Sequence, residues 1–216
     1  MELIGIRISP FVRKVRLVLA EKKLDYTIKD WAPFSLPDNY KEDYHPMGKI
    51  PLLVDGDLKL PDSSAICTYL EAKYPEISIF PKKPEALGTA LWFEEYADTQ
   101  IATNLTFAIF FERVVKPKYL DTPTDQKVVD NAIENEIPPM FDYLNSALEK
   151  SKFLAGDDYS IADFSICTHF VNVGYANYFI DKERWPKLAE YFERVKTIPS
   201  FKEILEDEIK FLAENN

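Results

Sequence analysis

The stretch LIGIRISPFVRKVRLVLAEKK, residues 3–23, decides the fold of the front of this chain. Leu3 to Ile8 is apolar, short and bounded by a turn signal, which predicts a strand. From Phe11 to Lys23 the apolar residues recur at helical spacing, which predicts a helix. Tyr26 to Trp31 predicts a second strand. The chain therefore opens with a strand, a helix and a strand.

A hairpin and a further helix continue this pattern. Pro51–Val54 and Leu58–Leu60 flank the turn Asp55-Gly56-Asp57, and an Asp-Gly pair is typical of a tight antiparallel hairpin. The next helix begins at Asp62-Ser63 and must end before Pro75. The predicted element order of this part of the chain is β-α-β-α-β-β-α.

The rest of the chain predicts helices alone, so the expected fold class is α/β plus all-α. We expect a first domain at residues 1–78, a Pro- and Lys-rich linker at residues 79–84 and an all-helical C-terminal bundle domain at residues 85–216. The helical patterns cover roughly residues 85–116, 124–151, 161–178, 184–197 and 199–213. Pro138-Pro139 is expected to kink or divide the second of them.

Composition and charge exclude several classes of protein. The chain has 46% hydrophobic and 29% charged residues, which is typical of a globular protein. No run approaches the roughly 18 apolar residues of a membrane span, and the charged start lacks the apolar core of a signal peptide, so we expect a cytoplasmic location. The net charge of −10 lies mainly in residues 81–216, which disfavours nucleic-acid binding.

Cysteine and histidine usage disfavours a metal site. Cys67 and Cys167 lie a hundred residues apart in helix-like surroundings, as reduced structural thiols do. The chain has 2 His and neither a CxxC nor an HExxH motif. We therefore expect no metal.

Three short segments are candidates for chemistry. Ser9-Pro10-Phe11 lies where the first strand gives way to the first helix, where open α/β sheets bind ligands. Capping alone would also explain it, since Ser is a favoured N-cap and Pro suits the first helical position. In Lys49-Ile50-Pro51, a cis proline would expose the backbone of Ile50 to an extended peptide ligand, whereas a trans proline would merely open a strand. Asp62-Ser63 could hold a carboxylate at a helix N-terminus or act as a cap.

These segments acquire a common meaning through a resemblance. SPFVRKVR (residues 9–16), PMGKIPLL (residues 46–53) and DSSAI (residues 62–66) resemble, in order and spacing, the signatures of the cytosolic glutathione S-transferase family. The Ser-Pro-Phe motif resembles the serine-type, bacterial-like members. FLAG (residues 153–156) followed by SIAD (residues 160–163) resembles the capping box of that family, a motif that reports fold.

The resemblance implies a thioredoxin-like first domain that binds glutathione as co-substrate. Ser9 would hydrogen-bond the glutathione sulfur as the catalytic residue. Ile50 would pair with the cysteinyl backbone ahead of cis-Pro51. Asp62 and Ser63 would hold the γ-glutamyl end, and Lys49 would attract the glycine carboxylate. Phe11 would also belong to the glutathione-binding residues.

The resemblance also implies a pocket for a hydrophobic electrophile between the domains. Its expected lining residues are Pro10, Phe107, Phe110, Phe111 and Tyr119. A Phe stripe at helical spacing is more often part of a core. His45 departs from the family, which more often has Asn before the proline, and this departure affects the geometry of the loop.

The activity implied is conjugation of the glutathione thiolate to an electrophile, with possible peroxidase side activity, in a detoxifying homodimer. Two alternatives keep the same fold. One is a non-catalytic adaptor of the starvation-protein kind, and the other is a glutathione-dependent isomerase or dehalogenase. Fold alone does not separate them.

Overall fold

The computed structural model describes residues 1–215, which form two compact units. The first unit combines residues 1–79 with the C-terminal helix α10 (Pro199–Glu214), and the second comprises residues 80–198. The expected helical domain, residues 85–216, thus differs from the second unit at its C-terminal end. The reason is that α10 packs against α1 (Pro10–Glu21) of the first unit.

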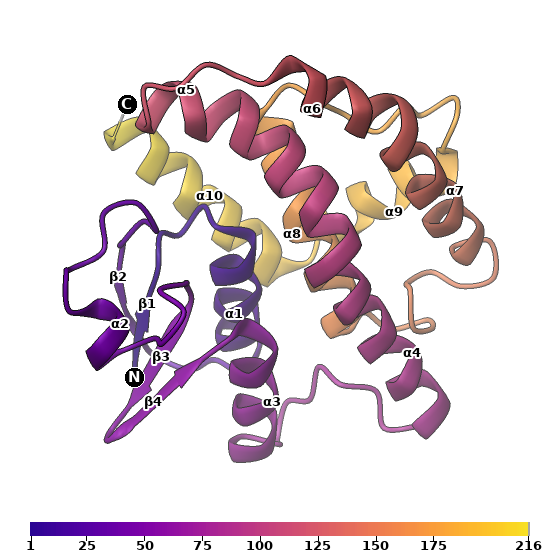
Figure 1. Cartoon of the computed structure of the whole chain (residues 1–216). Helices are drawn as coiled ribbons and strands as arrows, with labels where there is room; N and C mark the ends of the chain where they lie inside the picture. Colours follow the sequence, from indigo (N-terminus) through magenta and orange to yellow (C-terminus); the bar gives the residue numbers. More distant parts are fainter. Residues whose placement is uncertain (216) are drawn as a thin grey trace. The chain divides into compact units, whose positions relative to one another are not determined.

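A four-stranded mixed sheet forms the centre of the first unit. The spatial order of its strands is β2-β1-β3-β4. Strands β1 and β2 are parallel, whereas β3 is antiparallel to both β1 and β4. Helices α1 and α3 lie side by side on one face of the sheet, and α2 lies on the other (Figure 1). The order β-α-β-α-β-β-α is therefore confirmed, and the domain is thioredoxin-like. The elements are β1 (Glu2–Ile4), β2 (Thr27–Lys29), α2 (Tyr40–Asp43), β3 (Leu52–Asp55), β4 (Leu58–Pro61) and α3 (Ser63–Lys73).

The first strand ends at Ile4, four residues earlier than the apolar pattern indicates. Gly5 has a φ of 144°, a conformation that side-chain-bearing residues rarely adopt. The backbone N–H of Ile6 then donates to the carbonyl of Trp31 over 2.8 Å. Residues 5–9 form the loop that connects β1 to α1, and this bond holds the start of the loop beside the end of β2.

Buried apolar residues hold the sheet to its helices. Ile4 and Leu52 are fully buried and form a cluster with Tyr40 of α2. Val12 and Val15 of α1 are also fully buried. Burial of such side chains contributes roughly 1.5–3 kcal/mol each. This burial therefore stabilises the packing of α1 and α2 on the sheet.

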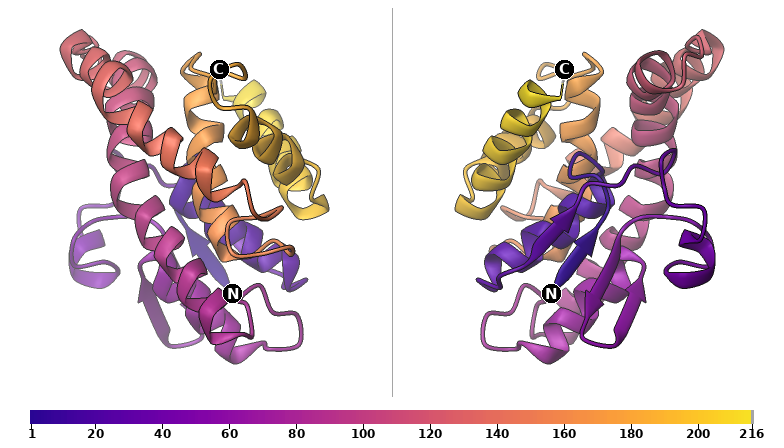
Figure 2. Two further views of the ribbon diagram at one scale, coloured as in Figure 1. Left: turned by 90° about the vertical axis from the view of Figure 1, so that its right-hand side faces the viewer. Right: turned by 90° about the vertical axis from the view of Figure 1, so that its left-hand side faces the viewer.

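The second unit is all-helical, as expected. Its first two elements, α4 and η1, follow one another as a long rod, and η1 is a π-helical stretch (Figure 2). Helix α7 follows the π-helical stretch η2 without a gap, so that the change of helix type lies directly before Pro138-Pro139, whose nitrogens have no N–H to donate. Within residues 1–215 no helix is long and apolar enough to cross a membrane. The elements are α4 (Pro84–Tyr96), η1 (Ala97–Val115), α5 (Lys116–Tyr119), α6 (Gln126–Asn131), η2 (Ala132–Glu136), α7 (Ile137–Ala147), α8 (Ile161–Tyr175) and α9 (Pro186–Lys196).

The predicted capping box starts α8. The side chain of Ser160 accepts from the backbone of Asp163, and the Asp163 carboxylate accepts the backbone N–H of Ser160 over 2.8 Å. Asp163 is fully buried and also accepts the hydroxyl proton of Tyr191 over 2.8 Å. The motif therefore fixes both the start of α8 and its contact with α9.

Candidate functional site

The register of the sheet brings the three candidate segments to one end of the first unit. Ile4 of β1 pairs with Leu52 of β3, and Leu52 pairs with Pro61 of β4. The segments that continue from these positions are residues 5–9, 50–51 and 62–63. The first two of these segments lie in close contact, since a Cβ added to Gly5 would lie 3.1 Å from the Cβ of Ile50.

Ser9 stands at the N-cap position of α1 without acting as a cap. Its φ of −68° and ψ of 131° are extended, and its N–H donates to the carbonyl of Ile6 over 3.0 Å. The hydroxyl makes no side-chain cap bond and has no hydrogen-bond partner among residues 1–215. Because α1 is 12 residues long, a hydroxyl at its start lies in the favourable field for an anion. This hydroxyl is therefore available to a ligand.

Ionic contacts hold the loop that carries Ser9. Arg7 donates its backbone N–H to Asp30 over 3.1 Å and its guanidinium to the same carboxylate over 2.7 Å. Arg13 donates to the carbonyl of Ile8 over 3.3 Å, and its guanidinium forms a buried pair with Glu208 of α10. The position of the loop thus depends on side chains of β2's end, α1 and α10.

The Ile50–Pro51 peptide bond is cis, as the resemblance implied. The backbone of Ile50 makes no hydrogen bond with any residue from 1 to 215. Lys49 is exposed, and its carbonyl accepts the hydroxyl proton of Tyr40 over 2.9 Å. Burial raises the pKa of Tyr40 to about 12, so this hydroxyl stays protonated as a donor. An extended ligand can therefore pair with Ile50 beside the positive charge of Lys49.

The loop before Lys49 keeps its turn although His45 replaces the more usual Asn. The Nδ1 atom of His45 accepts the backbone N–H of Met47 over 3.2 Å. The carbonyl of His45 accepts the N–H of Gly48 over 2.8 Å, which closes a four-residue turn. An Asn side chain at the first position of such a turn accepts the same bond. The ring nitrogen therefore takes the place of the amide oxygen, a role that the sequence did not predict.

At the start of α3 the cap is Asp62 and not Ser63. One Asp62 carboxylate oxygen accepts the N–H groups of Ser64 and Ala65, each over 3.0 Å. Asp62 has a φ of 75°, a strained conformation of the kind that collects at ligand sites. Ser63 is buried, and its hydroxyl has no hydrogen-bond partner within residues 1–215. Capping thus explains the Asp62 carboxylate and leaves the Ser63 hydroxyl unexplained.

The aromatic residues expected in the electrophile pocket differ in exposure. Phe107 of η1 is 53% exposed, whereas Phe110 is 6% exposed and offers little surface to a ligand. Phe111 and Tyr119 are partly buried in the second unit. Pro10 is buried in the first unit, where Phe11 is partly buried.

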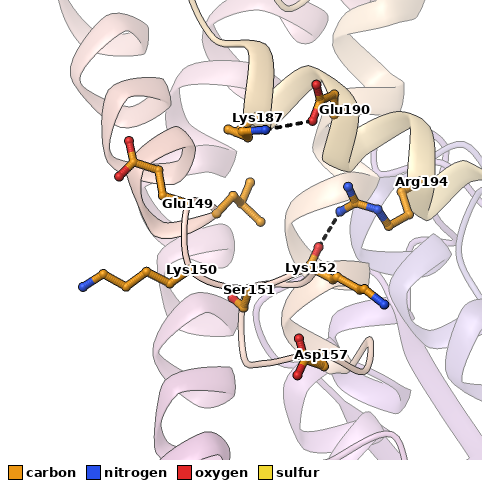
Figure 3. A pocket seen from close by; sticks show the side chains of 9 residues that line it. Glu149, Lys150, Ser151, Lys152, Asp157, Lys187, Glu190 and Arg194 are labelled. Atoms are coloured by element: carbon orange, nitrogen blue, oxygen red, sulfur yellow. Dashed lines mark hydrogen bonds and ion pairs between the residues drawn. The ribbon is translucent and has the colours of Figure 1, made fainter.

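A hollow elsewhere in the molecule has none of the candidate residues. Its volume is about 340 Å³, and its lining includes Lys152, Asp157, Lys187, Glu190 and Arg194 of the second unit (Figure 3). Lys187 pairs with Glu190 over 3.3 Å, and Arg194 donates to the carbonyl of Lys152 over 2.6 Å. Because these charges engage one another, the hollow does not select a ligand of one sign.

The two thiols lie outside the candidate site. Cys67 of α3 and Cys167 of α8 are both buried. Burial raises the pKa of Cys167 well above its ordinary value, which disfavours the reactive thiolate. Over the described residues, no group of three or more His, Cys, Asp or Glu side chains is placed to hold a metal ion.

Comparison with known proteins gives a consistent result. Residues 3–78 match the family model "Glutathione S-transferase, N-terminal domain", and residues 110–208 match "Glutathione S-transferase, C-terminal domain". A glutathione S-transferase of Hyoscyamus muticus is 32% identical over 173 residues, which is 76% of this chain and 77% of that protein. Glutathione S-transferase Z2 of Arabidopsis thaliana is 28% identical over 200 residues, 89% of this chain and 85% of that protein. The crystal structure of a glutathione S-transferase from Rhodospirillum rubrum F11 superposes with a TM-score of 0.85 at 28% identity and covers 94% of this chain and 91% of that one.

Proposed function

This chain belongs to the glutathione S-transferase family and is a glutathione transferase, and from that premise we propose that it is of the serine type, with Ser9 activating the thiol. The observation that supports this most is that three polar groups at one end of the sheet make no hydrogen bond within the described residues. The Ser9 hydroxyl, the Ile50 backbone and the Ser63 hydroxyl all lack a hydrogen bond to residues 1–215, and all belong to segments at one end of the sheet. Three unsatisfied polar groups at one place favour a polar, peptide-like ligand.

Ser9 would act by stabilising the glutathione thiolate. A thiol ordinarily titrates near pH 8.5, so a pKa lowered by about two units makes the thiolate dominant at neutral pH. That change requires roughly 2.7 kcal/mol. A hydrogen bond from the Ser9 hydroxyl to the charged sulfur, together with the N-terminus of α1, can supply it. The thiolate then attacks the electrophile.

The rest of the tripeptide would be held by the neighbouring segments. Ile50 would pair with the cysteinyl backbone, as one strand pairs with another. Ser63 would donate to the γ-glutamyl carboxylate, with Asp62 close to the γ-glutamyl ammonium group. Lys49 would attract the glycine carboxylate, and Phe11 would contribute packing. Apart from Phe11, each assignment pairs a polar group of the chain with a complementary group of glutathione.

We also propose a hydrophobic electrophile as the second substrate. Phe107 of the second unit is 53% exposed, and Phe111 and Tyr119 of the same unit are partly exposed, so they have aromatic surface that suits such a molecule. Conjugation of hydrophobic electrophiles fits a detoxifying role in the cytoplasm, and membership of the family favours a homodimer.

Calorimetric titration of the purified chain with glutathione tests the site. Ser63→Ala should weaken binding by about 1–2 kcal/mol, since it removes a hydrogen bond to a charged group. Thr68→Ala is the matched control, because the Thr68 hydroxyl already donates to the carbonyl of Ser64 one turn back on α3. Thiolate absorbance of the bound glutathione should give a pKa well below 8.5. Absence of binding at millimolar glutathione would contradict the proposal.

A further inference from the structure

We propose that His45 is a positioning residue of the glutathione site. Its unprotonated Nδ1 atom holds the turn before Lys49 and Ile50, so protonation of the ring in acid lowers the affinity for glutathione. The inference rests on the proposed function, because it assigns an effect on glutathione binding to a residue that does not itself need to touch glutathione. It makes His45 a determinant of KM and of the pH range of binding.

The turn depends on His45 at three points. Its N–H donates to the carbonyl of Tyr40 over 3.0 Å, its carbonyl accepts the N–H of Gly48, and its Nδ1 accepts the N–H of Met47. The first two bonds belong to the backbone and survive any substitution. The third needs a side chain with an acceptor two residues before the donor. His45 thus supplies the part of the turn that depends on the side chain.

The turn is joined directly to the glutathione-binding segment. Gly48 has a φ of 64° and packs on Lys41, where an added Cβ would lie 2.7 Å from Cε of that lysine. The next residue, Lys49, has its carbonyl held by the hydroxyl of Tyr40 over 2.9 Å. Tyr40 also stacks on the His45 ring, with the centroids 6.5 Å apart. A change at His45 therefore reaches the backbone that presents Ile50.

Protonation would abolish the bond between His45 and Met47. A protonated Nδ1 carries a hydrogen that faces the Met47 N–H, so two donors would oppose each other. Burial lowers the pKa of His45 below its ordinary 6.5. A hydrogen bond with the backbone of His45 itself opposes this shift, the charge of Lys49 adds to it, and Asp62 at the start of α3 opposes it. Tyr40 of α2 stacks on the His45 ring, and Tyr44, which directly follows α2, stacks on Tyr40.

The direction of the pH effect follows from this shift. The unfolded or opened loop takes up a proton near pH 6.5, whereas the closed turn does so only at lower pH. The closed turn therefore loses stability as the pH falls below about 6.5 toward the lower pKa of the folded state. Above about pH 7 the turn is intact, and glutathione affinity is independent of His45 protonation.

The test measures the Kd of S-methylglutathione, whose sulfur has no proton, at about pH 7.5 and at lower pH. His45→Asn retains an acceptor that does not titrate, and we expect its Kd at pH 7.5 to stay within about threefold of the unsubstituted protein. His45→Leu removes the acceptor, and we expect its Kd to rise about 5- to 10-fold, the value of one neutral hydrogen bond. Steady-state kinetics should show this loss in KM with little change in kcat.

The second comparison is the pH profile. Between about pH 7.5 and 5, the affinity of the unsubstituted protein should fall relative to that of His45→Asn, because only the unsubstituted protein has a residue 45 that takes up a proton. The other histidine, His169 of the second unit, is present in both proteins and does not affect the comparison. Tyr40→Phe should raise Kd about fivefold without changing the pH profile. His45→Leu that is folded by circular dichroism and binds as tightly as the unsubstituted protein would overturn the inference. Failure of the unsubstituted protein to bind S-methylglutathione would instead overturn the proposed function.

Discussion

The Nη2 atom of Arg13 in α1 lies 2.6 Å from the Oε2 atom of Glu208 in α10, and both side chains are completely buried. A second bond joins Nε of Arg13 to Oε1 of Glu208 over 2.8 Å. Arg16 adds a weaker contact with the same carboxylate over 3.4 Å. The same Arg13 guanidinium donates to the carbonyl of Ile8, next to Ser9. The C-terminal helix is therefore tied to the loop that carries the proposed catalytic residue.

Loss of the Glu208 charge should destabilise the protein strongly. Glu208→Gln removes the carboxylate charge that Arg13 contacts through two bonds, and removing one partner's charge from a buried pair costs about 3–5 kcal/mol. Urea unfolding gives the free-energy change directly. Glu206→Gln is the matched control on the same helix, because Glu206 is exposed and lies 3.9 Å from Lys202. We expect its effect to be below about 0.5 kcal/mol.

Replacement of both partners separates pairing from burial. In the double variant Arg13→Met with Glu208→Leu both charges of this pair are removed, so its loss of stability should be much smaller than the sum of the two single losses. Additive losses would show that the two side chains do not stabilise each other and would contradict the ionic interpretation of this contact.

A pH-dependent contribution to stability should come from Asp163. Burial raises the pKa of this carboxyl to about 6 from 3.8, although donors from Leu154, Ser160 and Tyr191 favour the ionised form. The folded chain therefore binds the proton more tightly than the unfolded chain. This stabilisation is fully present below about pH 4 and is lost as the pH rises through about 6.

The measurement is the free energy of unfolding of the unsubstituted protein relative to Asp163→Asn, which does not titrate. This difference should increase by about 1 kcal/mol when the pH falls from about 7 to 5. Contributions from other groups, such as His45, are common to both proteins and cancel. A difference that stays constant or falls over this range would show that the hydrogen-bond donors outweigh burial.

The sequence predicts elements far better than it predicts their partners. The periodicity of residues 161–178 and 199–213 indicates helices, but periodicity does not specify which surface a helix covers. A signal for α10 was present, because Glu208 falls on the same face as the buried Phe201 and Ile204. A carboxylate at a core position requires a buried cation, and α1 has two arginines among its apolar residues. Opposite charges on the buried faces of α1 and α10 therefore indicate that these two helices pair, whereas the apolar pattern alone does not predict this pairing.

The candidate site shows the same limit. Ser9, Ile50 and Ser63 were selected by motif, and the strand register explains why they lie at one end of the sheet. Nothing in a single sequence indicates that the Ser9 hydroxyl would be unused by its helix, since Ser is a favoured cap. The sequence also did not predict the role of His45. An imidazole ring nitrogen can accept the hydrogen bond that an Asn side chain would accept, but residue type alone does not show that Nδ1 of His45 accepts the N–H of Met47.

Gly5→Ala should destabilise the protein and perturb the site together. The φ of 144° is unfavourable for alanine, and the new Cβ would lie 2.6 Å from Cγ2 of Val12 and 3.1 Å from the Cβ of Ile50. We expect a loss of about 1–3 kcal/mol in thermal or urea unfolding, with weaker glutathione binding through displacement of Ile50. Gly88→Ala is the matched control in α4, where an added Cβ meets nothing within 4 Å, and it should stabilise by about 0.5–1 kcal/mol. Equal effects at the two positions would contradict this account.

Ser9→Ala should lower turnover while glutathione affinity changes little. The substitution removes a hydrogen bond to the developing thiolate, and loss of one such donor reduces kcat roughly 10- to 1,000-fold. The bound thiol pKa should move back toward 8.5, so the deficit should be large at about pH 6.5 and small at about pH 9, where the thiolate forms unaided. A chloronitrobenzene electrophile allows the pH–rate profile to be followed by absorbance. Ser35→Ala is the control, since Ser35 is exposed and its hydroxyl already donates to the carbonyl of Ala32. A deficit of equal size at every pH would mean that Ser9 positions the ligand without lowering its pKa, and unchanged turnover would remove Ser9 from the mechanism.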